Sequence, residues 1–75
     1  MELNDFIKNF ADQFEDTDVN EIKEDTLFHD LEEWDSLTAL AVLNMTQKKY
    51  GKKITFEDIK VCNTIKDLFN VIVEK

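Results

Sequence analysis

The sequence contains no arginine and no proline, and one glycine, one cysteine and one histidine stand among its 75 residues. A single cysteine excludes an internal disulfide framework and fits a reducing compartment. One cysteine and one histidine also cannot supply the ligands of a structural zinc site. Glycine and proline usually punctuate β-hairpins, so their scarcity predicts an all-α fold.

Positive charge is scarce as well, because nine lysines face seventeen acids and give a net charge of −8. Nucleic acids and anionic membrane surfaces need basic contacts, so we expect neither as a partner. The charge is also uneven: residues 1–35 hold thirteen acids and two lysines, whereas residues 36–75 hold seven lysines and four acids. The acidic first half favours contacts with basic patches on other proteins.

Long apolar runs are missing, since the longest covers residues 39–43 and a bilayer needs about 20 residues. The first residues also lack the basic and apolar regions of a signal peptide. We therefore expect no transmembrane segment and a cytoplasmic protein, or a mature form whose targeting peptide has been removed. A chain of this length holds one small core, so we expect a single, free-standing, monomeric domain over residues 1–75.

Apolar side chains recur at helical spacing near the start of the chain, and this pattern predicts an amphipathic helix over residues 3–15. The following stretch has no usable period. We expect it to form a long ordered loop, pinned to the core by apolar anchors, which are Ile22, Leu27, Phe28, Leu31 and Trp34. A loop of about twenty residues inside a compact domain normally means either that the assignment is wrong or that the loop is functional.

A second helix is expected from Asp35–Ser36 to Tyr50, with Gly51 as its left-handed C-terminal cap. The first turns of this helix are apolar on nearly every side. Such a helix is either central to the core or exposes an apolar strip to a partner.

Thr55 and Thr64 each stand three residues before an acid, which is a variant of the capping box. They predict a very short helix at residues 56–61 and a last helix at residues 65–74. The predicted architecture is therefore an all-α four-helix bundle, with a short third helix and a long ordered loop between the first two helices.

The spacing of Asp16, Asp18 and Asn20 is that of the first ligands of a calcium-binding loop. The sixth position of such a loop needs a glycine and holds Glu21, and the twelfth needs a bidentate glutamate and holds Leu27. We therefore expect a solvated acidic loop and no metal site.

Ser36, His29 and Asp35 are the residue types of a catalytic triad, yet Asp35 adjoins the serine and is badly placed to orient the histidine. No glycine-rich nucleophile elbow surrounds the serine. We expect His29 to be a partly exposed loop residue and Cys62 to fill space as a small apolar side chain. No catalytic constellation remains, so we do not expect an enzyme.

Ser36 has two interpretations. Asp, Ser and Thr before an apolar helix are ordinary N-caps. A serine at a helix N-terminus is also a favourable place for a phosphate, because free N–H groups and the helix dipole stabilise an anion there by about 0.3–1 kcal/mol. Trp34 and Leu37 add apolar side chains on either side of it.

Asp35-Ser36-Leu37, near the middle of an acidic chain of this size and at the start of its second predicted helix, resembles the attachment motif of acyl carrier proteins. The resemblance covers essentially the whole chain. It implies that Ser36 carries a covalent 4′-phosphopantetheine arm, derived from coenzyme A, whose thiol holds acyl groups as thioesters. It also implies that Asp35 helps present the serine to a phosphopantetheinyl transferase, that Leu37 contacts partner enzymes, and that the carrier itself catalyses nothing.

The sequence departs from the carriers of primary fatty-acid synthesis, which usually read Asp-Leu-Gly-Ala-Asp-Ser-Leu at this motif. Here residues 31–37 read Leu-Glu-Glu-Trp-Asp-Ser-Leu, with no glycine. The second helix of those carriers also bears several docking glutamates, and the matching places here hold Ala41, Asn44, Gln47, Lys48 and Lys49. We therefore expect a specialised carrier, serving a polyketide-like, aminoacyl or dedicated lipid pathway.

The acids nearest to the serine are the expected docking residues of this carrier. Glu32, Glu33 and Asp35 would meet a basic surface on an acyl-transferring or ligating enzyme, with Leu37 as an apolar contact. The alternative is an unmodified acidic helical inhibitor of the nuclease-immunity type, which would neutralise a basic partner by its charge. Ser36 discriminates between the two, since such an inhibitor has no need of Asp-Ser-Leu at a helix start.

Overall fold

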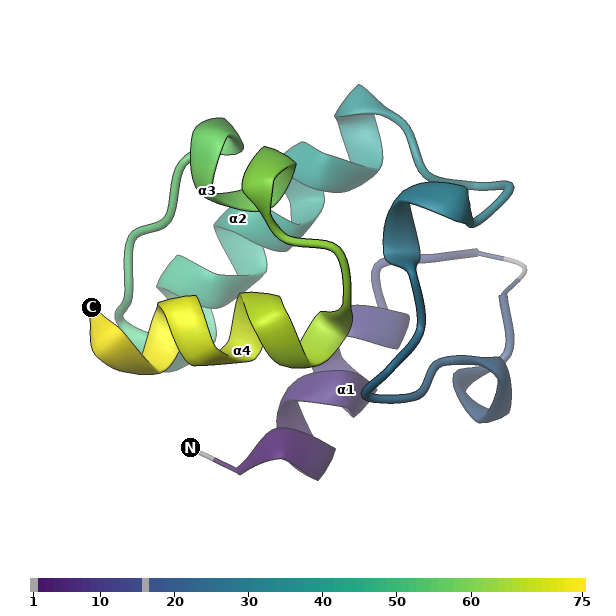
Figure 1. Ribbon diagram of the computed structural model, residues 1–75, viewed down its shortest axis with the longest axis horizontal. Helices are drawn as coiled ribbons and strands as arrows, with labels where there is room; N and C mark the ends of the chain where they lie inside the picture. The colour runs from purple at the N-terminus through teal and green to yellow at the C-terminus, as the bar shows by residue number, and fades with distance from the viewer. Residues whose placement is uncertain (1, 16) are drawn as a thin grey trace.

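Helices account for nearly all of the regular structure in the computed structural model, which describes residues 2–15 and 17–75. The α-helices are α1 (Leu3–Ala11), α2 (Ser36–Tyr50), α3 (Phe56–Val61) and α4 (Ile65–Glu74), and two short 3-10 helices, η1 (Val19–Glu21) and η2 (Phe28–Asp30), lie between α1 and α2. In Figure 1, α3 and α4 lie nearer to the viewer than α1 and α2, and the segment between α1 and α2 occupies the right of the view. The predicted all-α four-helix architecture with a short third helix is confirmed.

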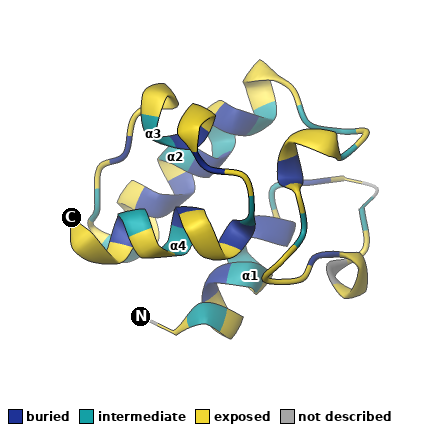
Figure 2. Ribbon diagram, viewed as in Figure 1, coloured by how far each residue is buried: buried dark blue, intermediate teal, exposed yellow. Residues whose placement is uncertain are grey.

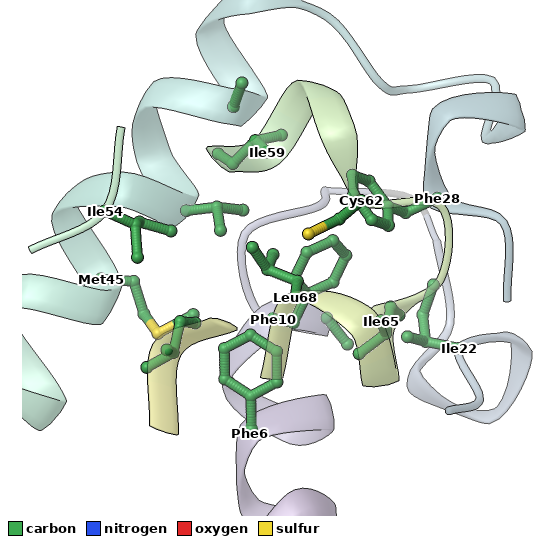
Figure 3. Packing of buried hydrophobic residues seen from close by; sticks show 14 of the residues in the cluster. Phe6, Phe10, Ile22, Phe28, Met45, Ile54, Ile59, Cys62, Ile65 and Leu68 are labelled. Atoms are coloured by element: carbon green, nitrogen blue, oxygen red, sulfur yellow. The ribbon is translucent and has the colours of Figure 1, made fainter. Parts of the chain in front are cut away.

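The core is formed by the inward faces of the α-helices and by a few side chains of the connections between them (Figure 2). Its buried apolar members are Phe6, Phe10, Ala11, Phe14, Ile22, Phe28, Ala39, Val42, Met45, Ile54, Ile59, Cys62, Ile65, Leu68 and Ile72. Figure 3 shows most of these side chains pointing toward one another, with the sulfur of Cys62 directed into the cluster. Cys62 therefore fills space as a small apolar side chain, as predicted.

An aromatic cluster fixes the loop that precedes α2. The ring of Phe28 meets Phe10 edge-on at 5.7 Å and Trp34 edge-on at 4.9 Å between centroids, and Phe10 stacks on Trp34 at 6.1 Å. Such aromatic pairs add about 0.5–1.5 kcal/mol each beyond their buried area. The chain immediately before Ser36 is thus held against α1.

The end of α1 differs from the prediction, because the helix stops at Ala11 rather than at residue 15. The chain continues in tight turns, in which the N–H of Gln13 donates to the carbonyl of Phe10 and the N–H of Phe14 donates to the carbonyl of Ala11. Phe14 is still buried, so the apolar period runs on beyond the α-helix. Apolar spacing alone does not distinguish an α-helical last turn from a 3-10 turn.

Leu27 was predicted to be an apolar anchor, and this was wrong, because its side chain is 51% exposed. Its backbone anchors the loop instead: Leu27 pairs with Thr64 in an isolated antiparallel bridge, and the N–H of Lys66 donates to the carbonyl of Glu24 at 2.9 Å. The other four predicted anchors are buried or packed against the core. In its described residues, the long loop is therefore pinned to the core, as predicted.

α2 runs from Ser36 to Tyr50, as predicted, and Gly51 ends it in the left-handed conformation with a φ of 66°. A glycine adopts this conformation without the strain that a Cβ would cause. The hydroxyl of Tyr50 donates to Asp5 at 3.0 Å and accepts from Asn9 at 2.7 Å. The end of α2 is therefore tied to α1.

Both predicted capping boxes form. The Thr55 hydroxyl accepts from the N–H of Asp58, the Thr64 hydroxyl accepts from the N–H of Asp67, and each aspartate accepts in return from the N–H of its threonine. A side-chain hydrogen bond from Lys75, whose Nζ lies 2.9 Å from Oδ2, is the main cause that lowers the pKa of Asp58. Hydrogen bonds from the backbone N–H groups of Thr64 and Asn63 lower the pKa of Asp67.

We expect Asp67→Asn to reduce the melting temperature at neutral pH and to have little effect in acid. The folded-state pKa of Asp67 lies below the ordinary 3.8, so the charged carboxylate stabilises the fold. That stabilisation is complete above the unfolded pKa and is lost as the pH falls through the folded pKa. Thermal unfolding followed by circular dichroism at neutral pH and at about pH 2 measures the difference.

Glu74→Gln is the matched control for this comparison, because it removes one charge from the same helix without removing a capping hydrogen bond. We expect its effect to be small at both pH values. If Asp67→Asn lowered the melting temperature equally at neutral and acid pH, this would contradict a role for the charge of Asp67.

Over the residues that the structure describes, no helix is both long enough and apolar enough to cross a membrane.

Candidate functional site

Asp35 and Ser36 have different roles at the start of α2. Asp35 is the N-cap, since its Oδ1 accepts from the N–H of Thr38 at 2.8 Å. Ser36 is the first helical residue, its side chain is exposed, and its hydroxyl has no hydrogen-bond partner among residues 2–15 and 17–75. The ordinary capping role therefore belongs to Asp35 and does not account for Ser36.

The carboxylate of Asp35 places a negative charge next to the serine. Hydrogen bonds from the backbone and the side chain of Thr38 hold the pKa of Asp35 below its ordinary value, so the group is ionised at neutral pH. The sequence predicted free N–H groups at this helix end, and the structure shows that Asp35 takes the N–H of Thr38. The positive end of the helix dipole thus already faces an anion.

A hollow of about 370 Å³ opens beside Ser36, between α2 and α3. Its lining residues are His29, Trp34, Asp35, Ser36, Ala39, Phe56, Ile59 and Lys60. The walls are mainly apolar. Among the lining residues, Lys60 contributes a positive charge and Asp35 a negative charge. Phe56 and Lys60 were not predicted as site residues. The sequence does carry a signal for Phe56, because an aromatic residue directly follows the capping Thr55 at the first position of a helix. In the structure its side chain is 52% exposed.

His29 is exposed, as predicted, and has a structural role. Its Nε2 donates to the carbonyl oxygen of Cys62 at 2.9 Å and to that of Ile59 at 3.1 Å. The imidazole therefore joins η2 to the end of α3. It also packs on the ring of Phe28, with centroids 4.4 Å apart, and forms part of the wall of the hollow.

Glu33 is a half-buried clamp within the fold, a role that was not predicted. Its Oε1 accepts from the N–H of Glu15 at 3.2 Å, and its Oε2 accepts from the hydroxyl of Thr17. Its backbone carbonyl accepts from the hydroxyl of Thr38 at 3.1 Å. Glu33 thereby joins the segment after α1 to the start of α2. A docking role for this residue stays a prediction.

The other predicted contact residues lie on different sides of Ser36. Glu32 is exposed in the loop, and the side chain of Leu37 is 77% exposed on α2. Leu37 and Glu33 line a second hollow, of about 450 Å³, on the side of α2 that faces the segment after α1. Asp35 lines both hollows.

No group of three or more His, Cys, Asp or Glu side chains that could hold a metal ion occurs within residues 2–15 and 17–75. Asp16, the first residue of the calcium-like spacing, lies outside the described residues. Asp18 is engaged locally, since its Oδ1 accepts from the N–H of Asn20 at 2.9 Å.

Comparison with known proteins identifies the family. The family model of the phosphopantetheine attachment site matches residues 5–72, which include all of α2 and α3. No curated protein and no solved structure gave a significant match. Members of this family attach 4′-phosphopantetheine covalently, act with a phosphopantetheinyl transferase and biosynthetic enzymes, and are not catalytic. Because the match spans nearly the whole chain, the resemblance is confirmed and this protein belongs to the acyl carrier protein family.

Proposed function

We propose that this protein carries thioester-linked intermediates on a 4′-phosphopantetheine arm attached to the hydroxyl of Ser36. The observation that carries the proposal is the division of roles at the start of α2, where Asp35 forms the cap and leaves the exposed serine hydroxyl without a partner among the described residues. A transferase can reach this hydroxyl without breaking the cap. When attached, the arm supplies a thiol that holds acyl groups as thioesters.

The residues around Ser36 fit such a group. Trp34, Phe56 and Ile59 offer apolar contact surface in the hollow next to the hydroxyl. Lys60, in the same hollow, supplies a positive charge that offsets the charge of Asp35 where a phosphodiester would add another negative charge. Asp35 fixes the first turn of α2 through Thr38 and so holds the serine at a constant position.

The family alone does not specify the pathway that the carrier serves. We infer a specialised carrier, whose partners are acyl-transferring or ligating enzymes of a polyketide-like, aminoacyl or dedicated lipid pathway. The support is the exposed surface of α2, which bears amides and lysines (Asn44, Gln47, Lys48 and Lys49) in place of acids. The inhibitor alternative gains no support from the family match. The cytoplasmic location, the domain bounds at residues 1–75 and the monomeric state stay predictions.

Loading of the arm tests the attachment site directly. We expect the chain to gain the mass of one 4′-phosphopantetheine after incubation with coenzyme A, magnesium and a promiscuous phosphopantetheinyl transferase. Fragmentation of the loaded chain should place the added mass on Ser36. A chain that stays unmodified, or that carries the mass on another hydroxyl, would contradict the proposal.

Glu32→Lys is expected to slow loading by about threefold to tenfold at low salt and to flatten the salt dependence of the rate. Glu32 is an exposed acid close to Ser36, and charges at the rim of an interface mainly govern the encounter rate. Glu33 is left unchanged because its clamp would be lost. Initial rates of loading over a range of salt concentrations measure the effect.

Glu24→Lys is the control for Glu32→Lys. It makes the same charge change at an exposed position of the same loop, next to the start of α4, where the backbone of Glu24 accepts from Lys66. Equal slowing by both variants would show that net charge matters and that Glu32 has no local docking role.

A further inference from the structure

A groove runs along α2 on the side that faces the segment after α1. Its first part is the hollow of about 450 Å³ near Leu37. Its second part, of about 350 Å³, is lined by Gln13, Ala41, Asn44, Met45, Lys48 and Lys49. Gln13 and Ala41 line both parts, so the two hollows adjoin one another along α2.

The two ends of this groove carry opposite charge. Glu15, Glu33 and Asp35 line the end near the serine, and Lys48 and Lys49 line the far end. Lys48 lies thirteen positions after Asp35, which corresponds to roughly 20 Å along the helix axis. That separation exceeds the Debye length of about 8 Å at physiological salt. A charged group of a partner at one end of the groove therefore interacts little with the charges at the other end.

The lysines of the far end are available to a partner. In the described part of the chain, the one ion pair joins Lys75 to Asp58 and involves neither Lys48 nor Lys49. Both lysines are exposed, and the apolar side chains that line the groove before them are those of Leu37, Ala41 and Met45. Along α2, acids therefore line the first part of the groove, small or apolar and amide side chains line its middle, and lysines line its far end.

We propose that this groove docks a helical surface segment of a partner enzyme with the reverse order of charge, basic near the serine and acidic at the far end. The proposal rests on the proposed function, because that partner is an enzyme that uses the arm on Ser36. A uniformly basic segment would place like charges against Lys48 and Lys49, which is unfavourable. Lys48 and Lys49 thus disfavour partners whose docking segment is basic throughout and complements an entirely acidic second helix.

Two synthetic helical peptides as long as α2 test this order of charge. Both have the same apolar face; one has arginines at one end and glutamates at the other, and the second has arginines at both ends. We expect the unmodified chain to bind the bipolar peptide about tenfold more tightly at physiological salt, where the screening length of about 8 Å keeps the two ends of the groove independent. Lys48→Glu together with Lys49→Glu should reverse this preference. Binding is followed by amide chemical shifts in titrations of the labelled chain.

Lys23→Glu together with Lys66→Glu is the matched control. It makes the same change in net charge at two exposed lysines that do not line the groove, so it should keep the preference for the bipolar peptide. Equal or tighter binding of the all-arginine peptide to the unchanged protein would overturn the proposal. Chemical-shift changes confined to residues away from α2 would also overturn it.

A second copy of this chain is the other possible occupant of the groove, since antiparallel α2 helices would also pair acidic with basic ends. A stable dimer in sedimentation equilibrium that is broken by the Lys48 and Lys49 variant would overturn docking of an enzyme. Peptide binding needs no arm, so its outcome is independent of loading. Failure to load Ser36 with the peptide preference intact would overturn only the proposed function.

Discussion

Ser36→Ala is expected to abolish loading completely while the fold remains intact. The substitution removes the one hydroxyl proposed to accept the arm. It removes no hydrogen bond seen among the described residues, because Asp35 is the cap of α2. Alanine is also the best helix former, so the change in the free energy of unfolding should stay within about 0.5 kcal/mol. Intact mass spectrometry measures loading, and circular dichroism measures stability.

Thr38→Ala is the control for this result, since it removes a neighbouring hydroxyl that bonds to the carbonyl of Glu33. We expect this variant to load and to lose some stability, which is the reverse of the result for Ser36→Ala. A full mass gain in Ser36→Ala would show that another residue carries the arm.

Phe28→Ala should lower the free energy of unfolding by about 3–5 kcal/mol. The Phe28 side chain is completely buried, and its ring contacts Phe10 and Trp34. Its removal leaves a cavity between α1 and the loop before Ser36, and a domain of this size has only about 5–15 kcal/mol of stability in total. Urea unfolding followed by circular dichroism gives the difference.

Leu27→Ala provides the comparison at the adjacent position. The Leu27 side chain is half-exposed, and the residue anchors the loop through its backbone bridge to Thr64, which an alanine retains. We expect this change to cost less than about 1 kcal/mol. Similar losses at the two positions would mean that the loop is not held by the ring of Phe28.

The helix boundaries that could be predicted are those set by local chemistry. Thr55 and Thr64 each find their capping partner three residues away, and Gly51 ends α2 by its own conformation. The end of α1 carries no such signal, because Asp12 after it keeps a right-handed helical conformation. Leu27 was misjudged for a related reason: an apolar residue in a loop does not reveal whether its side chain or its backbone makes the anchor.

The site was predictable in part. Asp-Ser-Leu at a helix start singled out Ser36, but Asp and Ser are both good caps, so only the structure assigns the cap to Asp35. Glu33 binds two residues that precede it by eighteen and sixteen positions in the chain, Glu15 and Thr17. The charged groove likewise depends on Gln13 and Ala41 lining the same hollows. Such contacts follow from tertiary packing, which no local pattern reports.

The position of Trp34 gives the protein an intrinsic optical reporter. It is the single tryptophan of the chain, it is packed against Phe10 and Phe28, and it lines the hollow beside Ser36. A group that packs against the indole in this hollow would change the polarity around it, which sets its emission wavelength. We therefore expect fluorescence to report the occupancy of the site in real time, without a dye attached to the carrier or to its cargo.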